Sequence, residues 1–362
     1  MSTTEDERAS ETQLLEQARA GDEGAFGELV EVYRDELRAH CYRLLGSVHD
    51  AEDAVQNAML RAWRGLQGFE GRSSVRSWMY AIATNAALDM TRNRSRRELP
   101  VNLGHPAERG AIVDPPLTDL PWLEPYPDQW LAGSAGSSPE ARYEQRESVE
   151  LAFLVALQHL SPLQRAVLIL REVVGFSAAE TARQLGTTVP SVTSALQRAR
   201  VSVAGRLPAR SQQSVLRDLG DQRLADIARR YADAIERGDA DALVSMLTKA
   251  ATWSMPPIPT WFSGVAAIRE WLIRDPLSER WKHRTTRANG QLAVGCYLFD
   301  SGTGRFEPAV IDVLTLDGDK IAAVTGFLMG PALGEDGDDF ASAAEVFRHF
   351  GLPVTWPDSE TS

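Results

Sequence analysis

A proline-rich acidic segment divides this sequence into parts that must fold separately. Residues 98–140 hold eight prolines and seven acidic residues but one arginine, and neither a helical nor a strand period runs through them. Proline removes a backbone donor and interrupts helices and sheets, so this stretch cannot be a core element. The sequence therefore predicts helical domains at 11–97 and 141–207, a linker at 98–140 and a third domain at 219–352.

Three aromatic residues, Trp122, Tyr126 and Trp130, interrupt the polar linker. A solvated tether does not need such side chains. We expect them to dock on a folded part of the chain, the alternative being loose local contacts.

Composition excludes several classes of protein. The longest apolar run, residues 151–157, is too short to span a membrane, and the acidic N-terminus does not resemble a secretory signal. Cys41 and Cys296 lie far apart and have no metal-ligand spacing around them, which argues against a disulfide framework or a zinc site. We expect a cytoplasmic protein with no membrane segment, metal or cofactor.

The net charge of −12 conceals two positive clusters. Residues 72–97 carry six arginines against one aspartate, and residues 164–210 carry seven arginines against two glutamates. A genomic preference for arginine would explain the residue type but not the clustering. Such local charge indicates contact with a phosphate backbone.

Apolar spacing in the first domain predicts helices. One ends at Gly46, a second is capped by Asp50, and a third covers residues 74–94 with Trp78, Ile82 and Leu88 buried. On spacing alone, the polar side of the second helix is an ordinary solvated face.

The second helix nevertheless resembles the core-binding helix of the extracytoplasmic-function group of the sigma-70 superfamily. Residues 50–63 read D-A-E-D-A-V-Q-N-A-M-L-R-A-W, with Asn57 and Met59 in place of the usual glutamate and phenylalanine. The resemblance implies docking on the β′ clamp helices of core RNA polymerase. The implied contact residues are Glu52, Asp53, Gln56, Asn57 and Arg61.

The third helix and the arginines after it are similar to the family's promoter-melting and minus-ten-reading segment. Arginines neutralise phosphates, and aromatic or amide groups can hold an extruded base. The alternative is that Trp78 and Tyr80 belong to the core. The implied DNA-binding residues are Arg76, Trp78, Tyr80, Asn85, Arg92, Arg94, Arg96 and Arg97.

Residues 160–207 have the pattern of a helix-turn-helix. Ser161 and Pro162 begin a helix, a turn is expected at 186–188, and the following helix has Val192, Leu196, Ala199 and Val203 facing inward. An ordinary helical hairpin is the alternative. The sequence resembles sigma region four, which contacts the β flap and reads the minus-thirty-five element. The outward residues are Ser191, Thr193, Ser194, Gln197, Arg198 and Arg200.

The last region changes from helices to β-rich runs, which predicts an α+β domain. We expect helices at 224–237, 240–247 and 265–274, and strands at 251–255, 285–288, 292–299, 306–316 and 321–328. The region is similar to the SnoaL-like group of cone-shaped barrels with one pocket. The expected pocket residues are Trp253, Met255, Trp261, Phe262, Trp271 and Phe327.

Three polar residues of this domain could support catalysis: His283, Asp300 and Asp312. We expect Asp300 to lie in a turn and His283 to be exposed between Lys282 and Arg284, so a regulatory module is favoured over an enzyme.

Together these patterns predict a multidomain protein: two all-α domains, the second with a helix-turn-helix, joined by an acidic linker and followed by a SnoaL-like barrel. The resemblance implies a sigma factor that binds core RNA polymerase and promoter DNA and is not an enzyme. We expect the barrel to modulate it in cis, with a small apolar ligand as a further partner. The alternatives are a ligand-sensing DNA-binding regulator that does not act with polymerase, and a fused enzyme that depends on Asp312.

The linker carries two further expectations. Residues 120–128, L-P-W-L-E-P-Y-P-D, resemble a motif of sigma factors that carry an extra C-terminal domain. In the family this connection passes near the RNA path of the polymerase, so its negative charge could imitate RNA.

Overall fold

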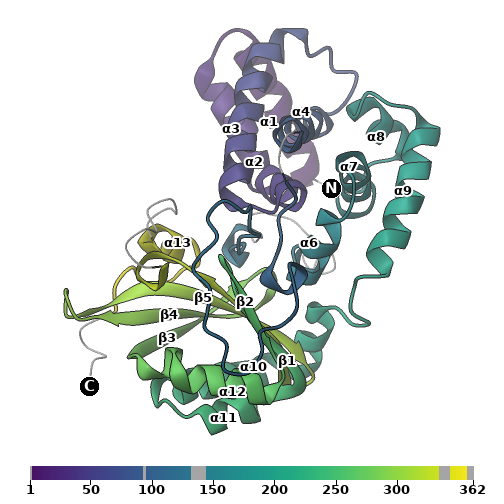
Figure 1. Cartoon of the computed structure of the whole chain (residues 1–362). Helices are drawn as coiled ribbons and strands as arrows, with labels where there is room; N and C mark the ends of the chain where they lie inside the picture. The colour runs from purple at the N-terminus through teal and green to yellow at the C-terminus, as the bar shows by residue number, and fades with distance from the viewer. Residues whose placement is uncertain (1, 93–94, 132–143, 334–342, 357–362) are drawn as a thin grey trace. The chain divides into compact units, whose positions relative to one another are not determined.

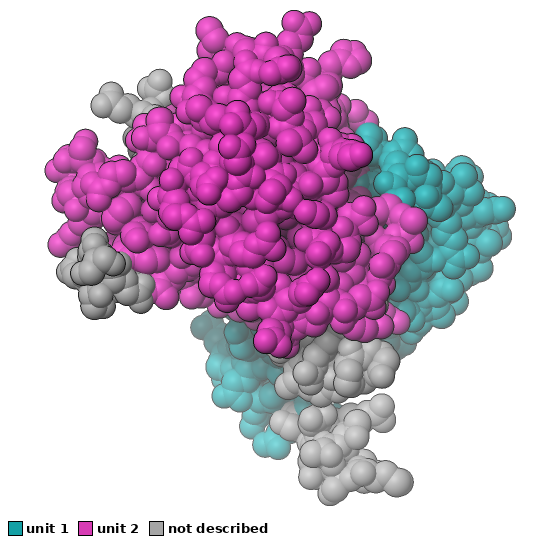
Figure 2. Space-filling model, turned by 90° about the horizontal axis from the view of Figure 1, so that it is seen from below, with its two compact units in different colours: residues 1–95, 130–138, 156–207 teal, residues 96–129, 139–155, 208–362 magenta. Residues whose placement is uncertain are grey.

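The structure, a computed structural model, describes residues 2–92, 95–131, 144–333 and 343–356. The chain forms two compact units, which Figure 2 colours separately. The first, here called the helical unit, comprises residues 1–95, 130–138 and 156–207. The second, the barrel unit, comprises residues 96–129, 139–155 and 208–362.

The helical unit contains the first domain and the helix-turn-helix (Figure 1). Its helices are α1 (Ser2–Arg19), α2 (Glu23–Leu45), α3 (Val48–Gly65), α4 (Val75–Thr91), α7 (Pro162–Leu168), α8 (Ala178–Gln184) and α9 (Val189–Ala204), with a π-helical turn at Ile169–Val173. A further helix, α6 (Leu151–Gln158), begins in the barrel unit and ends in the helical unit.

Local capping explains where these helices begin and end. Gly46 closes α2 with φ 73°, as expected. The cap of α3 is Ser47, whose Oγ accepts a hydrogen bond from the backbone N–H of Asp50 at 3.1 Å, so the expectation that Asp50 is the cap is wrong. Ser161 caps α7 in a capping box with Gln164, as its position before Pro162 suggests.

The buried face of α4 differs from the expected one. Trp78, Ile82 and Leu88 are only half-buried, whereas Met79 and Ala83 are fully buried. The residues spaced four apart on the buried side of α4 are Val75, Met79, Ala83 and Ala87, and the helix packs on α2 and α3, which leaves Trp78, Ile82 and Leu88 at the margin.

The barrel unit is a curved sheet of six strands, with three helices packed along one face and the short last helix on the other (Figure 1). Its helices are α10 (Gln212–Glu236), α11 (Ala240–Ser245), α12 (Val265–Arg274) and α13 (Ala343–His349). Its strands are β1 (Leu247–Met255), β2 (Ile258–Ser263), β3 (Trp281–Ala288), β4 (Gln291–Asp300), β5 (Arg305–Asp317) and β6 (Lys320–Leu328).

The strand order is β2-β1-β6-β5-β4-β3, with β1 and β6 parallel and all other neighbours antiparallel. Strand β2 was not among the expected strands, and Pro259, a residue found mainly in edge strands, lies within it. Asn289 and Gly290 join β3 to β4 with φ 55° and 68°, the two left-handed residues of a tight hairpin turn.

The linker residues 96–129 belong to the barrel unit. Trp122 and Tyr126 are buried, which confirms that these aromatic residues dock. Trp130 lies half-buried in the helical unit, with the Arg38 guanidinium 4.3 Å from its ring centroid. Residues 132–140 of the expected linker and Arg94 lie outside the described residues.

Candidate functional sites

Helix α3 presents a polar strip opposite a stripe of small apolar residues. Asp53, Gln56, Asn57 and Arg61 are exposed and Glu52 is half-buried, while Ala51, Ala54, Val55 and Ala58 are buried. The Asn57 amide donates to the Asp53 carbonyl at 2.9 Å, and Arg61 pairs with Asp89 of α4 at 2.9 Å. The strip is therefore a surface of carboxylate and amide groups on a firmly packed helix.

Part of the α4 surface that was expected to bind DNA is covered within the helical unit. The Tyr80 ring is buried and meets Phe176 edge to face at 5.4 Å, and its hydroxyl donates to Glu36 at 3.1 Å. Arg76 pairs with Glu36 at 3.0 Å and lies over the Tyr80 ring. Burial, together with the Glu36 carboxylate, raises the pKa of the Tyr80 phenol. Tyr80 is thus buried, as the alternative of a core position predicted, whereas Arg76 pairs with Glu36 while 39% of its side chain remains exposed.

The helix-turn-helix also packs against α4. The Gln184 amide of α8 donates to the Ser77 hydroxyl at 3.0 Å and to its carbonyl at 3.4 Å, while Asn85 remains exposed beside it. Arg165 is buried and donates to the Leu44 carbonyl in the last turn of α2, where the helix dipole favours a cation. The two helical domains are therefore held together by buried polar contacts.

The arginines after α4 fall into separate environments. Arg92 is exposed and pairs with Asp89 at 3.4 Å, whereas Trp78 lies against Phe69 with ring centroids 4.8 Å apart. In the barrel unit, Arg96 pairs with Glu98, and Arg97 donates to the Trp122 carbonyl at 2.6 Å. Part of the expected DNA-binding cluster thus contacts the linker.

Helix α9 has the expected inward and outward faces. Val192, Leu196, Ala199 and Val203 are buried, which confirms the inward stripe. The outward residues are exposed except Ser191, which is half-buried: they are Thr193, Ser194, Gln197, Arg198 and Arg200. Arg200 pairs with Glu172 of the π-helical turn.

The β3–β4 turn holds both the linker and the residues just before α6. The Asn289 side chain accepts a hydrogen bond from the Tyr126 backbone N–H at 2.9 Å and donates to the Val149 carbonyl at 2.9 Å. The Gly290 N–H donates to Asp128 at 2.7 Å. Burial raises the pKa of Asp128 to about 6. We call Asn289 and Gly290 the clasp.

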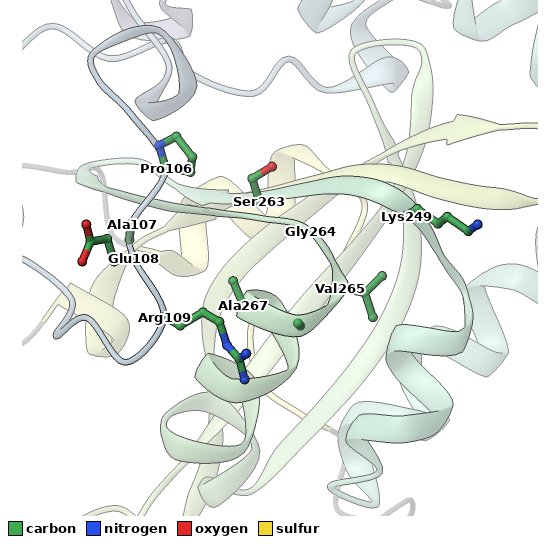
Figure 3. A pocket seen from close by; sticks show the side chains of 10 residues that line it. Pro106, Ala107, Glu108, Arg109, Lys249, Ser263, Gly264, Val265 and Ala267 are labelled. Atoms are coloured by element: carbon green, nitrogen blue, oxygen red, sulfur yellow. The ribbon is translucent and has the colours of Figure 1, made fainter.

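Linker residues also cover the free edge of the sheet at β2. The Ala107 and Leu117 N–H groups donate to the carbonyls of Trp261 and Pro257 at 2.8 and 3.0 Å, and the Asp114 N–H donates to the Thr260 hydroxyl at 2.9 Å. An exposed edge strand is prone to pairing with another chain, and here the linker makes hydrogen bonds to that edge instead. Figure 3 shows the groove of about 600 Å³ between residues 106–109 and the start of α12.

A cavity of about 290 Å³ lies between the sheet and the helices of the barrel unit. Trp253, Met255 and Trp271 line it as expected, but Trp261, Phe262 and Phe327 do not. Side chains alternate along a strand, so Phe327 points away from the cavity that its neighbours Gly326 and Leu328 line. Phe262 stacks behind Trp271 at 5.0 Å, and the Trp261 indole donates to Gly104 of the linker at 3.2 Å.

Polar groups gather at one wall of this cavity. The Asp312 carboxylate accepts from the Tyr231 hydroxyl at 2.8 Å and from the Cys296 thiol at 3.3 Å. Burial raises the pKa of Asp312, although these hydrogen bonds oppose it. The expectation that His283 is exposed is wrong: its side chain is buried, lines the cavity and lies 3.3 Å from Glu236. Asp300 lies in a turn as expected, accepting from the Gly302 N–H at 2.7 Å.

Tyr231 and Glu236 were not identified as site residues from the sequence. Both lie on α10, where Tyr231 has the spacing of an ordinary core residue. The sequence offers no signal that these side chains reach β5 and β3.

Comparison with known proteins identifies the family. The chain matches the models for sigma-70 region 2 at residues 29–97, sigma-70 region 4 at 150–203 and the SnoaL-like domain at 228–324. It is 40% identical over 335 residues to the ECF RNA polymerase sigma factor SigG of Mycobacterium tuberculosis, covering 91% of this chain and 84% of that protein. The chain belongs to the extracytoplasmic-function sigma factors.

Other relatives match parts of this sigma factor or its whole architecture. SigM of Mycobacterium tuberculosis is 32% identical over 197 residues, 54% of this chain and 83% of that protein. The crystal structure of the Mycobacterium tuberculosis extracytoplasmic function sigma factor SigJ has the same fold, with a TM-score of 0.53 at 21% identity, covering 86% of this chain and 99% of that one.

Family membership establishes the general role: this sigma factor directs promoter recognition at transcription initiation and partners with core RNA polymerase and promoter DNA. A sigma factor is a transcription factor and not an enzyme. Because sigma factors act with core RNA polymerase, the alternative of a DNA-binding regulator that does not act with polymerase is excluded. In the part of the chain that the structure describes, no helix is long and apolar enough to cross a membrane.

Proposed function

We propose that the α3 strip is the surface by which this sigma factor binds the β′ clamp helices, with Glu52, Asp53, Gln56, Asn57 and Arg61 as contacts. What supports this is the exposure of a carboxylate and amide surface on a helix whose other side is fully packed. Such a surface suits polar, charge-steered docking. The cytoplasm is its proposed place of action, because polymerase and promoter DNA are there.

Charge reversal tests this proposal. Asp53→Lys is expected to abolish capture of core RNA polymerase in a pull-down and run-off transcription with it, while binding of duplex promoter DNA is retained. Glu28→Lys is the matched control, since Glu28 is an equally exposed carboxylate on α2. Equal polymerase capture by both variants would overturn the assignment.

We further propose that promoter contact requires the two helical domains to separate. α4 and the arginines after it then meet the minus-ten element, through Arg76, Trp78, Tyr80, Asn85, Arg92, Arg94, Arg96 and Arg97. α9 meets the minus-thirty-five element, through Ser191, Thr193, Ser194, Gln197, Arg198 and Arg200, with region four on the β flap. The supporting observation is that Tyr80 is buried under Phe176.

The barrel is proposed to control this separation in cis. The clasp holds Tyr126 of the linker and Val149 just before α6, so it restrains the chain between the helical domains and limits how far they can move apart. Asn289→Gly keeps the left-handed turn but removes both side-chain hydrogen bonds. Run-off transcription by this variant is expected to rise above wild type, and an unchanged yield at matched concentrations would contradict control by the clasp.

In this proposal the barrel is a regulatory and not a catalytic part, and its further partner is a small apolar ligand in the cavity. The specific observation favouring the enzymatic alternative is the buried Asp312 beside Tyr231. Turnover of an isomerisable ketone that is lost in Asp312→Ala would support catalysis.

A further inference from the structure

The geometry of the barrel unit points to a binding site for an uncharged aromatic molecule with a hydroxyl group. We propose that Val113 of the linker forms part of its wall, so that this ligand and the docking of the linker stabilise each other. The inference deepens the ligand and cis-control roles proposed above, and its biological consequence rests on them.

The walls of the cavity select an aromatic ligand. Trp253, Trp271 and Trp281 line it, and the rings of Trp253 and Trp271 lie 5.5 Å apart at 59°. Aromatic rings prefer tilted or offset contacts with one another, which an aromatic ligand between these residues can make. The volume of about 290 Å³ suits a small molecule of one or two rings.

One oxygen of Asp312 is available to such a ligand. Tyr231 and Cys296 both donate to Oδ2, and among the described residues no hydrogen bond reaches Oδ1. Gly326 lines the cavity beside it, and a Cβ there would lie 2.7 Å from Oδ1, so a side chain at this position would crowd that oxygen.

A second polar group in the cavity wall also lacks a partner. The Trp271 indole N–H is buried and has no hydrogen-bond partner within the described part of the chain. Leaving a buried donor unpaired is costly. A hydroxyl can donate to a carboxylate and accept from an N–H, which is why we assign this group to the ligand.

The linker completes the cavity through Val113. Hydrogen bonds fix it on both sides: Arg274 donates to the carbonyls of Gly110, at 3.1 Å, and Ala111, and the Asp114 N–H donates to Thr260 at 2.9 Å. A ligand that touches Val113 binds the docked linker better than the released one. By linkage, it must then favour docking to the same extent.

The test uses 2-naphthol with the full chain, its affinity measured by isothermal titration calorimetry. Val113→Trp fills the cavity and is expected to weaken binding at least tenfold. Ile112→Trp is the matched control, because Ile112 is the adjacent linker residue and is 88% exposed; its affinity should remain within twofold of wild type. Naphthalene, which lacks the hydroxyl, should bind about tenfold more weakly to wild type, and this preference should disappear in Asp312→Ala.

Coupling is measured by hydrogen exchange of linker residues 107–117. If 2-naphthol binds only the docked form, exchange should slow about tenfold at ten times the Kd. Absence of binding, equal affinities of the two Trp variants, or binding that leaves linker exchange unchanged would each overturn the proposal. These measurements contain no polymerase, so their failure is distinct from a failure of the α3 or clasp experiments.

Discussion

The contact between Gln184 and Ser77 offers a direct test of whether the helical unit must open to work. Gln184→Ala removes two hydrogen bonds, at 3.0 and 3.4 Å, and leaves the buried Ser77 hydroxyl without this partner. A net loss of about 1.5 kcal/mol is expected, because the second bond is long and each contributes about 1 kcal/mol. That is about a tenfold rise in the ratio of open to closed molecules.

Opening can be followed by energy transfer between dyes on introduced cysteines. Arg64→Cys on α3 and Val201→Cys on α9 are exposed positions, whereas both native cysteines are buried and should resist labelling. The low-transfer population should rise about tenfold in Gln184→Ala, and not in Gln17→Ala, which removes an exposed glutamine on α1.

The same shift should appear in DNA binding. If only the open form binds a single-stranded minus-ten oligonucleotide, the apparent Kd falls in proportion to the open fraction, up to about tenfold. An open population within twofold of wild type in Gln184→Ala, with the fold intact, would refute the view that this contact holds the domains closed.

Three further predictions concern charge and packing. Burial raises the pKa of Glu150 to about 7, against hydrogen bonds from Gln213 and Gln212 and with the help of the negative Glu147. The contribution of Glu150 to the free energy of unfolding is complete below about pH 4.5. It is lost as the pH rises through 7, and the loss is about 3 kcal/mol in all. Denaturant unfolding should show this loss in wild type and not in Glu150→Gln. Arg198→Ala should weaken binding to all promoter sequences alike and reduce the salt slope of log K by about 1, measured by fluorescence anisotropy. Leu37→Ala, in the fully buried centre of α2, should lower the free energy of unfolding by about 3 kcal/mol in the same denaturant assay.

Some local helical features were predictable from spacing, although the cap of α3 and the buried face of α4 were not. The inward stripe of α9 follows the helical period, and the Ser161 cap follows from Pro162. His283 shows where this reasoning fails. Its charged neighbours suggested exposure, but in strand β3 the alternate side chains face inward, and Glu236 of α10 supplies the partner.

Contacts between distant segments left no local signal. The sequence near Tyr80 does not indicate that Phe176 will cover its ring, because an aromatic residue in either position could equally lie in a core or on a surface. The pocket residues were partly predictable. Trp253 and Met255 lie two apart on β1 and share a face, whereas the adjacent Trp261 and Phe262 cannot both line one cavity.

The acidic linker shows how structure changes the meaning of a charge pattern. Its negative charge suggested imitation of RNA, yet four of its carboxylates already have partners in the barrel unit: Glu98 with Arg96, Glu124 with Arg97, Asp114 with Thr260 and Asp128 with Gly290. Glu98 is buried and Glu124 and Asp128 are half-buried, so the docked linker exposes little of these three charges, whereas Asp114 stays exposed. Full exposure of Glu98, Glu124 and Asp128 therefore requires the linker to leave the barrel unit, which is the step that a ligand touching Val113 would oppose.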